Sequence, residues 1–317
     1  MYEKYFTTAE NLRYTIDTFG VAIIPNVLSE IECDAFTNET WDYFEHITQN
    51  WTVPIMRNDP TTYRSIYELY PSHSMLFQHF GVGHSQAVWN IRQNPKVVEI
   101  QQKFWNTTEL SVSFDGQSFA IPHEITKRGY YRNNCWLHCD QSFTRNEFEC
   151  LQSWVTANDV DEGDATLVVL ERSNCYHAEF KETFNISDKK DWYKLNEEET
   201  KFYTETPRNC ELVKIKCPKG SIVYWDSRTI HFGCEAMKVR ANPHYRCVAY
   251  LCYVPKSLVP PSIQRKKIKA FEEKRTTTHN PIKPRLFGKQ PQTYGKVLNE
   301  VKQVETPILT ELGRSLI

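Results

Sequence analysis

A succession of short strand patterns in the second half of the chain constrains its fold most strongly. Between residues 136 and 254, runs rich in β-branched and aromatic residues alternate with turn signals such as Pro218-Lys219-Gly220. The predicted strands cover residues 151–157, 165–170, 211–217, 221–225, 229–232 and 247–254. Several short strands at this spacing are typical of a β-sandwich or barrel. We therefore predict a mainly β fold with flanking helices.

Helices are expected before the strand series. Residues 21–28 read as an opening strand and turn, and the capping box Ser29-Glu30-Ile31-Glu32 then starts a helix. Asn94-Pro95 predicts a second helix, because asparagine is a good cap and proline suits the first helical position. The apolar stripe expected to pack the first helix against the core is Ile31, Ala35, Phe36, Tyr43, Phe44 and Ile47.

The composition narrows the classes of partner. The chain has 317 residues, 40% of them hydrophobic, and its 38 basic residues nearly cancel 39 acidic ones. Such a balance creates no global field for nucleic acid or an anionic membrane. No apolar run approaches the length needed to cross a bilayer, and no secretory signal stands at the start. Ten scattered cysteines without a C-x-x-C pair favour reduced thiols, so we expect a cytoplasmic protein.

A candidate metal site stands at the beginning of the strand series. In an extended strand His138 and Asp140 point to one face, while Cys139 points to the other. His231 lies about ninety residues downstream on a late strand, which a folded-back sheet can place beside the early one. Two histidines and one carboxylate form the facial ligand set of non-haem Fe(II) oxygenases. The alternative for an isolated H-x-D is a surface loop or a satisfied core histidine.

A basic residue follows the second histidine. Arg246 directly precedes the alternating strand that starts at Cys247. A guanidinium can hold a carboxylate through two parallel hydrogen bonds. Arg246 is therefore a candidate clamp for a dicarboxylate co-substrate beside the metal.

Together these segments resemble the phytanoyl-CoA dioxygenase family. The resemblance covers about residues 15 to 275 and includes the opening strand with its capped helix. Its motifs are W-L-H-C-D at 136–140, E-G-D-A-T-L at 162–167 and G-S-I-V-Y-W-D-S-R-T-I-H at 220–231, of which W-D-S-R-T-I-H is the most specific. The resemblance implies a double-stranded β-helix, or jelly-roll, core and the use of Fe(II), 2-oxoglutarate and O2.

Carried over position by position, the resemblance implies that His138, Asp140 and His231 are the metal ligands. It also implies that a downstream basic residue anchors 2-oxoglutarate. Arg246 stands fifteen positions after His231, a longer spacing than is common in the family, and Arg240 at nine positions is the competitor. We favour Arg246, because it directly precedes a strand, whereas Arg240 lies in a predicted loop. Halogenating relatives have a small residue in place of the carboxylate, and this chain retains Asp140.

The implied activity is hydroxylation of a C–H bond in an unidentified small molecule, with succinate and CO2 as co-products. One alternative is a non-catalytic metal-binding or sensing module on the same fold. Another is a zinc hydrolase, although the sequence offers it no additional general base and leaves the arginine unexplained. The candidate wall residues of the site, each of which could instead be ordinary core, are Trp136, Trp154, Trp225 and Tyr250.

We predict a single domain over residues 1–317. Its parts are a helical region at about 1–110, the β core at about 111–255 with a charged insertion at 181–203, and a C-terminal helix and tail at 256–317. Residues 51–90 form either a lid or an irregular packed segment, and the insertion is either a solvated rim or a flap. In the last part, a basic helix is expected to expose Arg265, Lys266, Lys267 and Lys269, and the tail wraps the domain or hangs loose.

Overall fold

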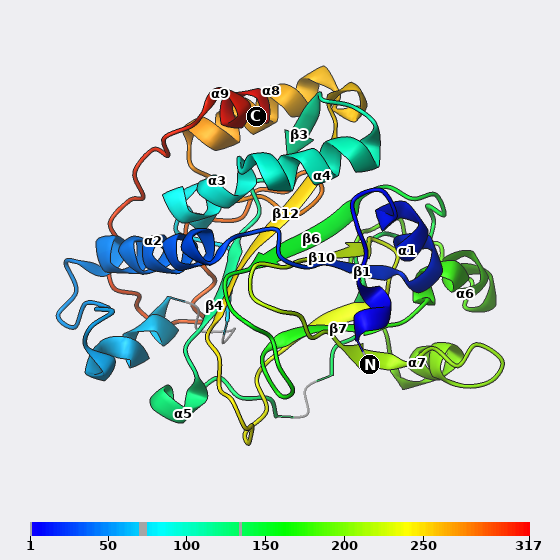
Figure 1. Ribbon diagram of the computed structural model, residues 1–317, viewed down its shortest axis with the longest axis horizontal. Coiled ribbons are helices and arrows are strands. Elements are labelled where there is room, and N and C mark those ends of the chain that lie inside the picture. The colour runs from blue at the N-terminus through cyan, green and yellow to red at the C-terminus, as the bar shows by residue number, and fades with distance from the viewer. Residues whose placement is uncertain (1, 70–74, 133–134) are drawn as a thin grey trace.

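Two antiparallel sheets form the centre of the protein (Figure 1). The computed structural model describes residues 2–69, 75–132 and 135–317. The larger sheet has seven strands in the order β1-β10-β6-β12-β4-β2, and β3 pairs with β12. Its strands are β1 (Val21–Ile24), β2 (Leu76–Phe77), β3 (Leu110–Val112), β4 (Gln117–Ala120), β6 (Leu151–Thr156), β10 (Ile222–Asp226) and β12 (Arg246–Pro255).

The smaller sheet has five strands in the order β8-β5-β11-β7-β9. They are β5 (His138–Cys139), β7 (Thr166–Leu170), β8 (Tyr193–Lys194), β9 (Leu212–Lys214) and β11 (His231–Cys234). The six strands predicted after residue 150 correspond to β6, β7, β9, β10, β11 and β12. The sequence prediction of this strand series is therefore confirmed, with boundaries that differ by a few residues.

A shared core joins the two sheets. Trp154 and Val223 of the larger sheet pack in one buried cluster with Leu167 and Val169 of the smaller sheet. Burying one face of each sheet against the other removes apolar side chains from water. The protein thus consists of paired antiparallel sheets with helices around them, as predicted, but more of its residues lie in helices than in strands, so the expectation of a mainly β chain is only partly met.

Helices cover the outer face of the larger sheet. A second buried cluster combines residues of α2, α3 and α4 with Leu151, Tyr224 and Leu251 of the sheet (Figure 1). The α-helices are α1 (Leu12–Phe19), α2 (Glu30–Thr48), α3 (Gln86–Arg92), α4 (Pro95–Trp105), α5 (His123–Thr126), α6 (His177–Thr183), α7 (Glu197–Thr204), α8 (Pro261–Glu272) and α9 (Glu311–Ser315). Short 3-10 helices span Glu3–Tyr5, Pro60–Glu68, Val82–His84, Ser173–Tyr176 and Lys256–Leu258. In the described part of the chain, no helix is both long and apolar enough to cross a bilayer.

The predicted start of α2 is confirmed, but its predicted apolar stripe is partly wrong. Ser29 and Glu32 form the capping box. Ile31, however, is 81% exposed, and Ala35 is exposed as well. Each lies two residues from the buried Cys33, and two residues turn an α-helix by about 200°, so both side chains point to the solvent face. The buried residues of α2 are Cys33, Phe36, Thr40, Trp41, Tyr43, Phe44, Ile47 and Thr48.

Most of residues 51–90 pack into the protein. Trp51, His84 and Trp89 are buried, while Met75, Leu76 and Gln78 reach the large cavity described below. Tyr70 and His73, which also belong to this predicted segment, lie outside the described residues. The packed alternative therefore holds for most of the described part of the segment.

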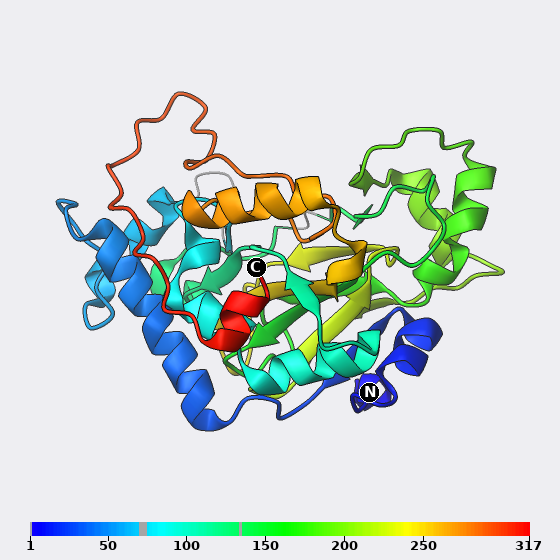
Figure 2. The same cartoon turned by 90° about the horizontal axis from the view of Figure 1, so that it is seen from above.

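The C-terminal part wraps the domain, one of the two predicted outcomes. Figure 2 shows the chain after α8 running over the molecule to α9, and Val304 and Leu316 join the helix-facing core. The prediction that Lys267 is exposed is wrong. Lys267 is 1% exposed, with its ammonium group on the Ser111 hydroxyl and 5.2 Å from the ring of Phe114. The helix turns this one lysine towards the core, since α8 docks on the sheet through that side.

Candidate metal centre

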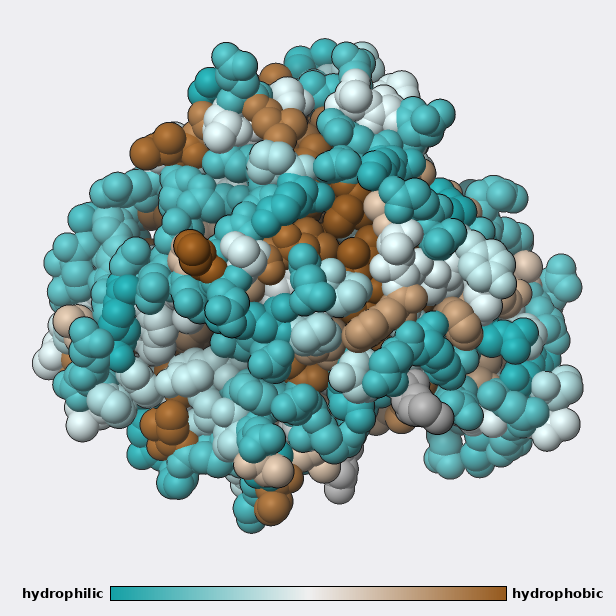
Figure 3. All heavy atoms as spheres, in the orientation of Figure 1, coloured by the Kyte–Doolittle hydropathy of each residue, from teal (hydrophilic) through white to brown (hydrophobic). Residues whose placement is uncertain are grey.

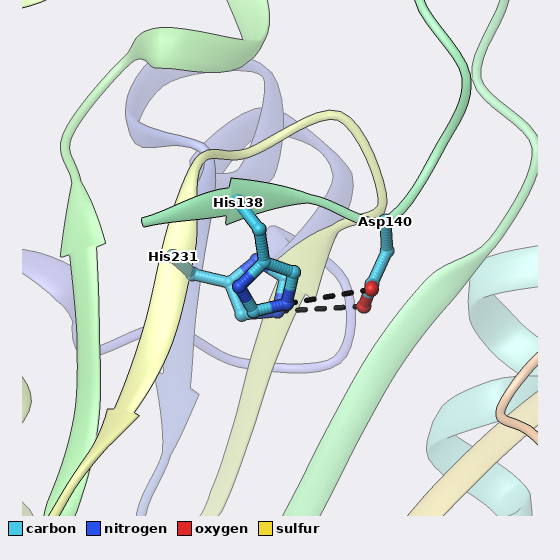
Figure 4. Close-up of side chains that lie close together, drawn as sticks. All are labelled: His138, Asp140 and His231. Atoms are coloured by element: carbon cyan, nitrogen blue, oxygen red, sulfur yellow. Dashed lines mark ion pairs between the residues drawn. The ribbon is translucent and has the colours of Figure 1, made fainter. Parts of the chain in front are cut away.

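Strand pairing brings the two predicted histidines together. His138 on β5 and His231 on β11 are register partners, and their ring centroids are 4.4 Å apart. Asp140 directly follows β5, and its two carboxylate oxygens lie 3.4 Å from His138 Nε2 and 3.4 Å from His231 Nε2. Figure 4 shows both imidazoles turned towards this carboxylate. The potential ligand atoms of the three residues all lie within 4.8 Å of one another, so the group could hold a metal ion.

Backbone carbonyls orient both imidazoles. His138 Nδ1 lies 3.3 Å from the Trp136 carbonyl oxygen, and His231 Nδ1 lies 2.9 Å from that of Thr229. A proton on Nδ1 donates to the carbonyl and leaves the Nε2 lone pair free, which is the tautomer that binds metals. Burial, reinforced by His231, also lowers the pKa of His138. A neutral, ligand-ready imidazole is therefore favoured at this position.

Asp140 is held in its charged form by its neighbours. Gln152 donates from Nε2 to Asp140 Oδ2 at 3.0 Å, and His279 Nδ1 lies 3.7 Å from the same oxygen. Burial alone would raise the pKa of Asp140. The attraction of His279 and hydrogen bonds with the two other triad residues nevertheless hold that pKa well below its usual value. The carboxylate is thus available as an anionic metal ligand.

The W-D-S-R-T-I-H motif builds the turn that delivers His231. Asp226 is fully buried and pairs with Arg228 at 2.6 Å. The Thr229 hydroxyl donates to the Gly20 carbonyl at 2.8 Å, which ties the turn to the start of β1. These contacts fix the backbone immediately before His231 and explain why the motif is polar although it is buried.

A cavity of about 720 Å³ surrounds the triad. All three triad residues line it, as do the predicted wall residues Trp136, Trp154, Trp225 and Tyr250. Trp136 stacks on His138 at a centroid distance of 4.8 Å and an interplanar angle of 3°. The volume lies in the range of small-molecule sites. On the face drawn in Figure 3 the surface is mainly hydrophilic, with hydrophobic side chains gathered in a central area.

Arg246 lines the same cavity as the triad. It is 5% exposed and is the first residue of β12. Its Nε donates to the Ser118 hydroxyl at 3.0 Å, and its Nη1 donates to the Ala165 carbonyl at 2.8 Å. Among the described residues no carboxylate forms an ion pair with it. A buried cation without an anionic partner is costly, so the cavity is suited to an anionic ligand.

Arg240 lies elsewhere and is already paired. Its side chain is 1% exposed and forms ion pairs with Glu124, at 2.9 Å, and with Asp164. His244 Nδ1 also lies 2.8 Å from an Asp164 oxygen. Two carboxylates therefore compensate the charge of Arg240, which holds the E-G-D turn against the segment before β12.

Two neighbours of the triad were not anticipated from the sequence. Gln152 lies on β6, where the polar residues Ser153 and Thr156 also occur, so the strand pattern does not single it out. His279 comes from the C-terminal tail, where no local pattern marks it. Asp191, Trp192 and Lys194 of the charged insertion also line the cavity, so part of that segment reaches the site.

The residues present fit Fe(II) and 2-oxoglutarate. The nitrogen and oxygen donors of the triad are the types that suit Fe(II). Arg246 offers a compensating charge for a dicarboxylate. The indole Nε1 atoms of Trp154 and Trp225, both in the cavity wall, are buried and have no hydrogen-bond partner within the described structure. Buried donors of this kind call for an acceptor, which carboxylate oxygens would supply.

No known family model matches the chain. One curated protein, the Ava biosynthesis cluster protein O of Aspergillus versicolor, is 28% identical over 211 residues, which are 64% of this chain and 65% of that protein. The match therefore spans less than two thirds of the relative. The resemblance to the phytanoyl-CoA dioxygenase family stays a prediction.

Solved structures share the fold. A hypothetical protein of Escherichia coli, JW0805, has a TM-score of 0.58 at 14% identity, over 98% of this chain and 82% of that one. GlcNAc Inducible Gene 2 of Candida albicans, a DUF1479 protein, has a TM-score of 0.57 at 15% identity, over 83% of this chain and 67% of that one. The epimerase SnoN, solved with Fe3+ and alpha ketoglutarate, reaches only 0.47 at 12% identity, over 78% and 83% of the two chains. That last likeness is too weak to support a conclusion about this chain.

Proposed function

We propose that this chain is an Fe(II)- and 2-oxoglutarate-dependent oxygenase that hydroxylates a C–H bond of a small molecule. The observation that carries the proposal is a buried arginine without a carboxylate partner in the same cavity as a His-Asp-His triad. A metal site alone would fit many enzymes. A metal site with an adjacent uncompensated guanidinium fits a metal that works together with an anionic co-substrate.

His138, Asp140 and His231 are the proposed metal ligands. Each histidine would bind through Nε2, because its Nδ1 faces a backbone carbonyl. Gln152 keeps one oxygen of Asp140 occupied and so limits rotation of the carboxylate. All three side chains line the cavity, so a metal held by them would be accessible to a co-substrate there. Bound Fe(II) would couple the decarboxylation of 2-oxoglutarate by O2 to hydroxylation of the substrate, leaving succinate and CO2.

Arg246 is the proposed anchor for the far carboxylate of 2-oxoglutarate. Its Ser118 and Ala165 contacts hold the guanidinium in place, which lowers the cost of orienting the ligand. Trp154 and Trp225 would donate their unpartnered Nε1 hydrogens to the bound dicarboxylate. Arg240 is unsuited to this role, because two carboxylates already hold it outside the cavity.

The paired sheets are proposed to be a double-stranded β-helix in a single domain. Support comes from the early strand β5 lying beside the late strand β11, and from the shared core between the sheets. Membership of the phytanoyl-CoA dioxygenase family is likewise proposed, on the W-D-S-R-T-I-H and H-x-D motifs.

Anaerobic binding and turnover experiments test this function. Calorimetry should show one Fe(II) or Mn(II) site per chain, and 2-oxoglutarate should bind only after the metal. On admission of O2, the iron-loaded protein should release succinate slowly, and faster when a substrate is supplied from metabolite extracts. Failure of the Fe(II)- or Mn(II)-loaded protein to bind 2-oxoglutarate would overturn the proposal, whereas tight zinc binding alone would not, because most nitrogen and oxygen sites bind Zn2+ more tightly than Fe(II).

A further inference from the structure

The edge strand β8 places a lysine next to the triad. His138 is paired with His231 on one side and with Lys194 on the other. Directly opposed residues in antiparallel strands project to the same face, with Cβ atoms about 4.5 to 5.5 Å apart. Lys194 therefore shares the face of the two histidines, and it lines the cavity.

The charge of Lys194 is available to a ligand. The neighbouring acids Asp191 and Glu149 are both paired with Arg145. Across the described chain, no carboxylate forms an ion pair with Lys194, which is exposed at the mouth of the cavity. Arg285 of the C-terminal tail also lines the cavity and is exposed. Lys194 and Arg285 thus offer two positive charges without an ion pair among the described residues, in a cavity that Asp115 and Glu235 also line.

Trp192 presents an exposed aromatic surface at the same place. Its side chain is 53% exposed although its ring lies 5.7 Å from that of His138. Its backbone has a φ of +68°, a left-handed conformation that is strained for a bulky residue. The Trp192 amide donates to the Asp140 carbonyl at 3.1 Å, so the chain holds the indole over the site. An exposed indole in a strained conformation gains little for the fold, which points to a contact with a ligand.

We propose that Trp192 and Lys194 recognise the substrate, and that the substrate is a flat aromatic molecule that carries an acidic group. This inference rests on the proposed function of the cavity. The acid would pair with Lys194 and the ring would lie on the indole of Trp192. Because both residues lie beside His138, a molecule held in this way would lie next to the triad. The cavity of about 720 Å³ limits the substrate to a small molecule.

Matched probes test this recognition without knowledge of the natural substrate. Three probes are titrated by calorimetry under anaerobic conditions: 2-naphthoate, 2-naphthylmethanol and decahydro-2-naphthoate. The protein is loaded with Mn(II) and saturated with 2-oxoglutarate, so that Arg246 and the metal are occupied. We expect 2-naphthoate to bind at least about tenfold more tightly than the alcohol, which lacks the charge. We also expect it to bind more tightly than the saturated acid, which lacks the ring.

Variants assign the two contributions. Lys194→Gln should weaken 2-naphthoate to the affinity of the alcohol, while Lys194→Arg should retain the preference. Trp192→Ala should weaken both aromatic probes, and Trp192→Phe should restore part of the loss. Lys190→Gln is the matched control, since Lys190 belongs to the same segment, is 87% exposed and does not line the cavity. It should leave all affinities unchanged.

The outcomes separate this inference from the proposed function. Equal binding of the three probes, or an unchanged preference in Lys194→Gln, would overturn the inference even if Mn(II) and 2-oxoglutarate bind as expected. If neither Mn(II) nor 2-oxoglutarate binds, the proposed function fails. The probes are then compared on the unloaded protein, where the same preference and the same variant effects would still support recognition by Trp192 and Lys194.

Discussion

Asp140 is positioned by residues from three distant parts of the chain. His231, Gln152 and His279 all approach the carboxylate, at 3.4, 3.0 and 3.7 Å. A metal-binding carboxylate without such support can rotate, and loss of supporting contacts typically costs affinity. At the scale of single residues, the site therefore depends on polar partners as much as on the ligands themselves.

The substitution Gln152→Leu tests this support. Removal of the amide leaves Asp140 Oδ2 without its 3.0 Å donor, and we expect Mn(II) affinity to fall by about tenfold or more. Calorimetry measures the affinity, and circular dichroism checks the fold. Gln49→Leu is the control, because Gln49 is exposed and donates only to the His46 carbonyl at the end of α2. Equal affinities in both variants would contradict a supporting role.

The substitution Arg246→Ala separates metal binding from co-substrate binding. We expect 2-oxoglutarate affinity to fall by about 100-fold, since charge-assisted hydrogen bonds are lost, while Mn(II) affinity stays unchanged. Arg246→Lys should recover only part of the loss, because an ammonium group cannot form the bidentate pair.

Arg240→Lys serves as the control for the competing anchor. It should preserve 2-oxoglutarate binding and lower the melting temperature, since Arg240 makes ion pairs with Glu124 and Asp164. The reverse pattern, with 2-oxoglutarate affinity lost only in the Arg240 variant, would assign the anchor to Arg240.

At the scale of elements, strand order determines the neighbours of His138, and the docking of α8 determines the burial of Lys267. β5 lies between β11 and β8, so a strand of two residues places one histidine between a second ligand and a lysine. The helix α8 docks with Lys267 buried against Ser111 and Phe114. Burial lowers the pKa of Lys267 to about 7.

The burial of Lys267 predicts a pH dependence of stability. The pKa is about 7 in the folded chain and 10.5 for an ordinary lysine, so the unfolded chain binds more protons between these values. Lys267 should therefore contribute a stability that rises with pH across this window, by at most about 1.4 kcal/mol per unit of pKa difference. This contribution is read as the difference from Lys267→Met, because buried thiols such as Cys217 and Cys247, whose pKa burial raises, act in the opposite direction. Urea titrations at several pH values measure it.

The substitution Lys267→Met should remove this rise. Lys269→Met, on the exposed side of the same helix, should retain it, because the Lys269 side chain is 72% exposed. Parallel pH profiles of the native protein and Lys267→Met would show that this ammonium group does not respond to burial as expected.

At the scale of the whole molecule, the C-terminal tail connects the core to the cavity. Thr278, His279 and Phe287 line the cavity, and Leu316 joins the core between the helices and the larger sheet. The Val112 amide donates to the Leu316 carbonyl at 3.0 Å. One segment thus contributes both to stability and to the wall of the site.

Two apolar residues of the tail provide a matched test of this role. Leu316 is 2% exposed and Ile308 is 81% exposed. Leu316→Ala should lower the free energy of unfolding by about 2 to 5 kcal/mol, whereas Ile308→Ala should change it by less than about 0.5 kcal/mol. Denaturant unfolding measures both values. Similar small effects would mean that the tail is not part of the cooperative unit.

Local patterns were sufficient for the strand series after residue 150, for the starts of α2 and α4, and for the shared face of His138 and Asp140. Period-two alternation and turn residues located the strands after residue 150, and the capping residues Ser29 and Asn94 located the starts of α2 and α4. The H-x-D spacing placed His138 and Asp140 on one face, and the structure brings His231 to them. Patterns of this kind depend on residues close in sequence, and the regular spacing of side chains in strands and helices determines which of them share a face.

Only the tertiary structure decided which distant side chains complete the site. No local pattern marks His279 or Gln152 for this cavity, and the pattern of the insertion does not single out Lys194. Lys267, expected at the surface, is buried, and Ile31, expected in the core, is exposed. Burial depends on what packs against a face, and pairing depends on which strands become neighbours. The sequence by itself determined the chemical types available for a metal site, whereas the packing of sheets, insertion and tail determined the shape and charge of the cavity around it.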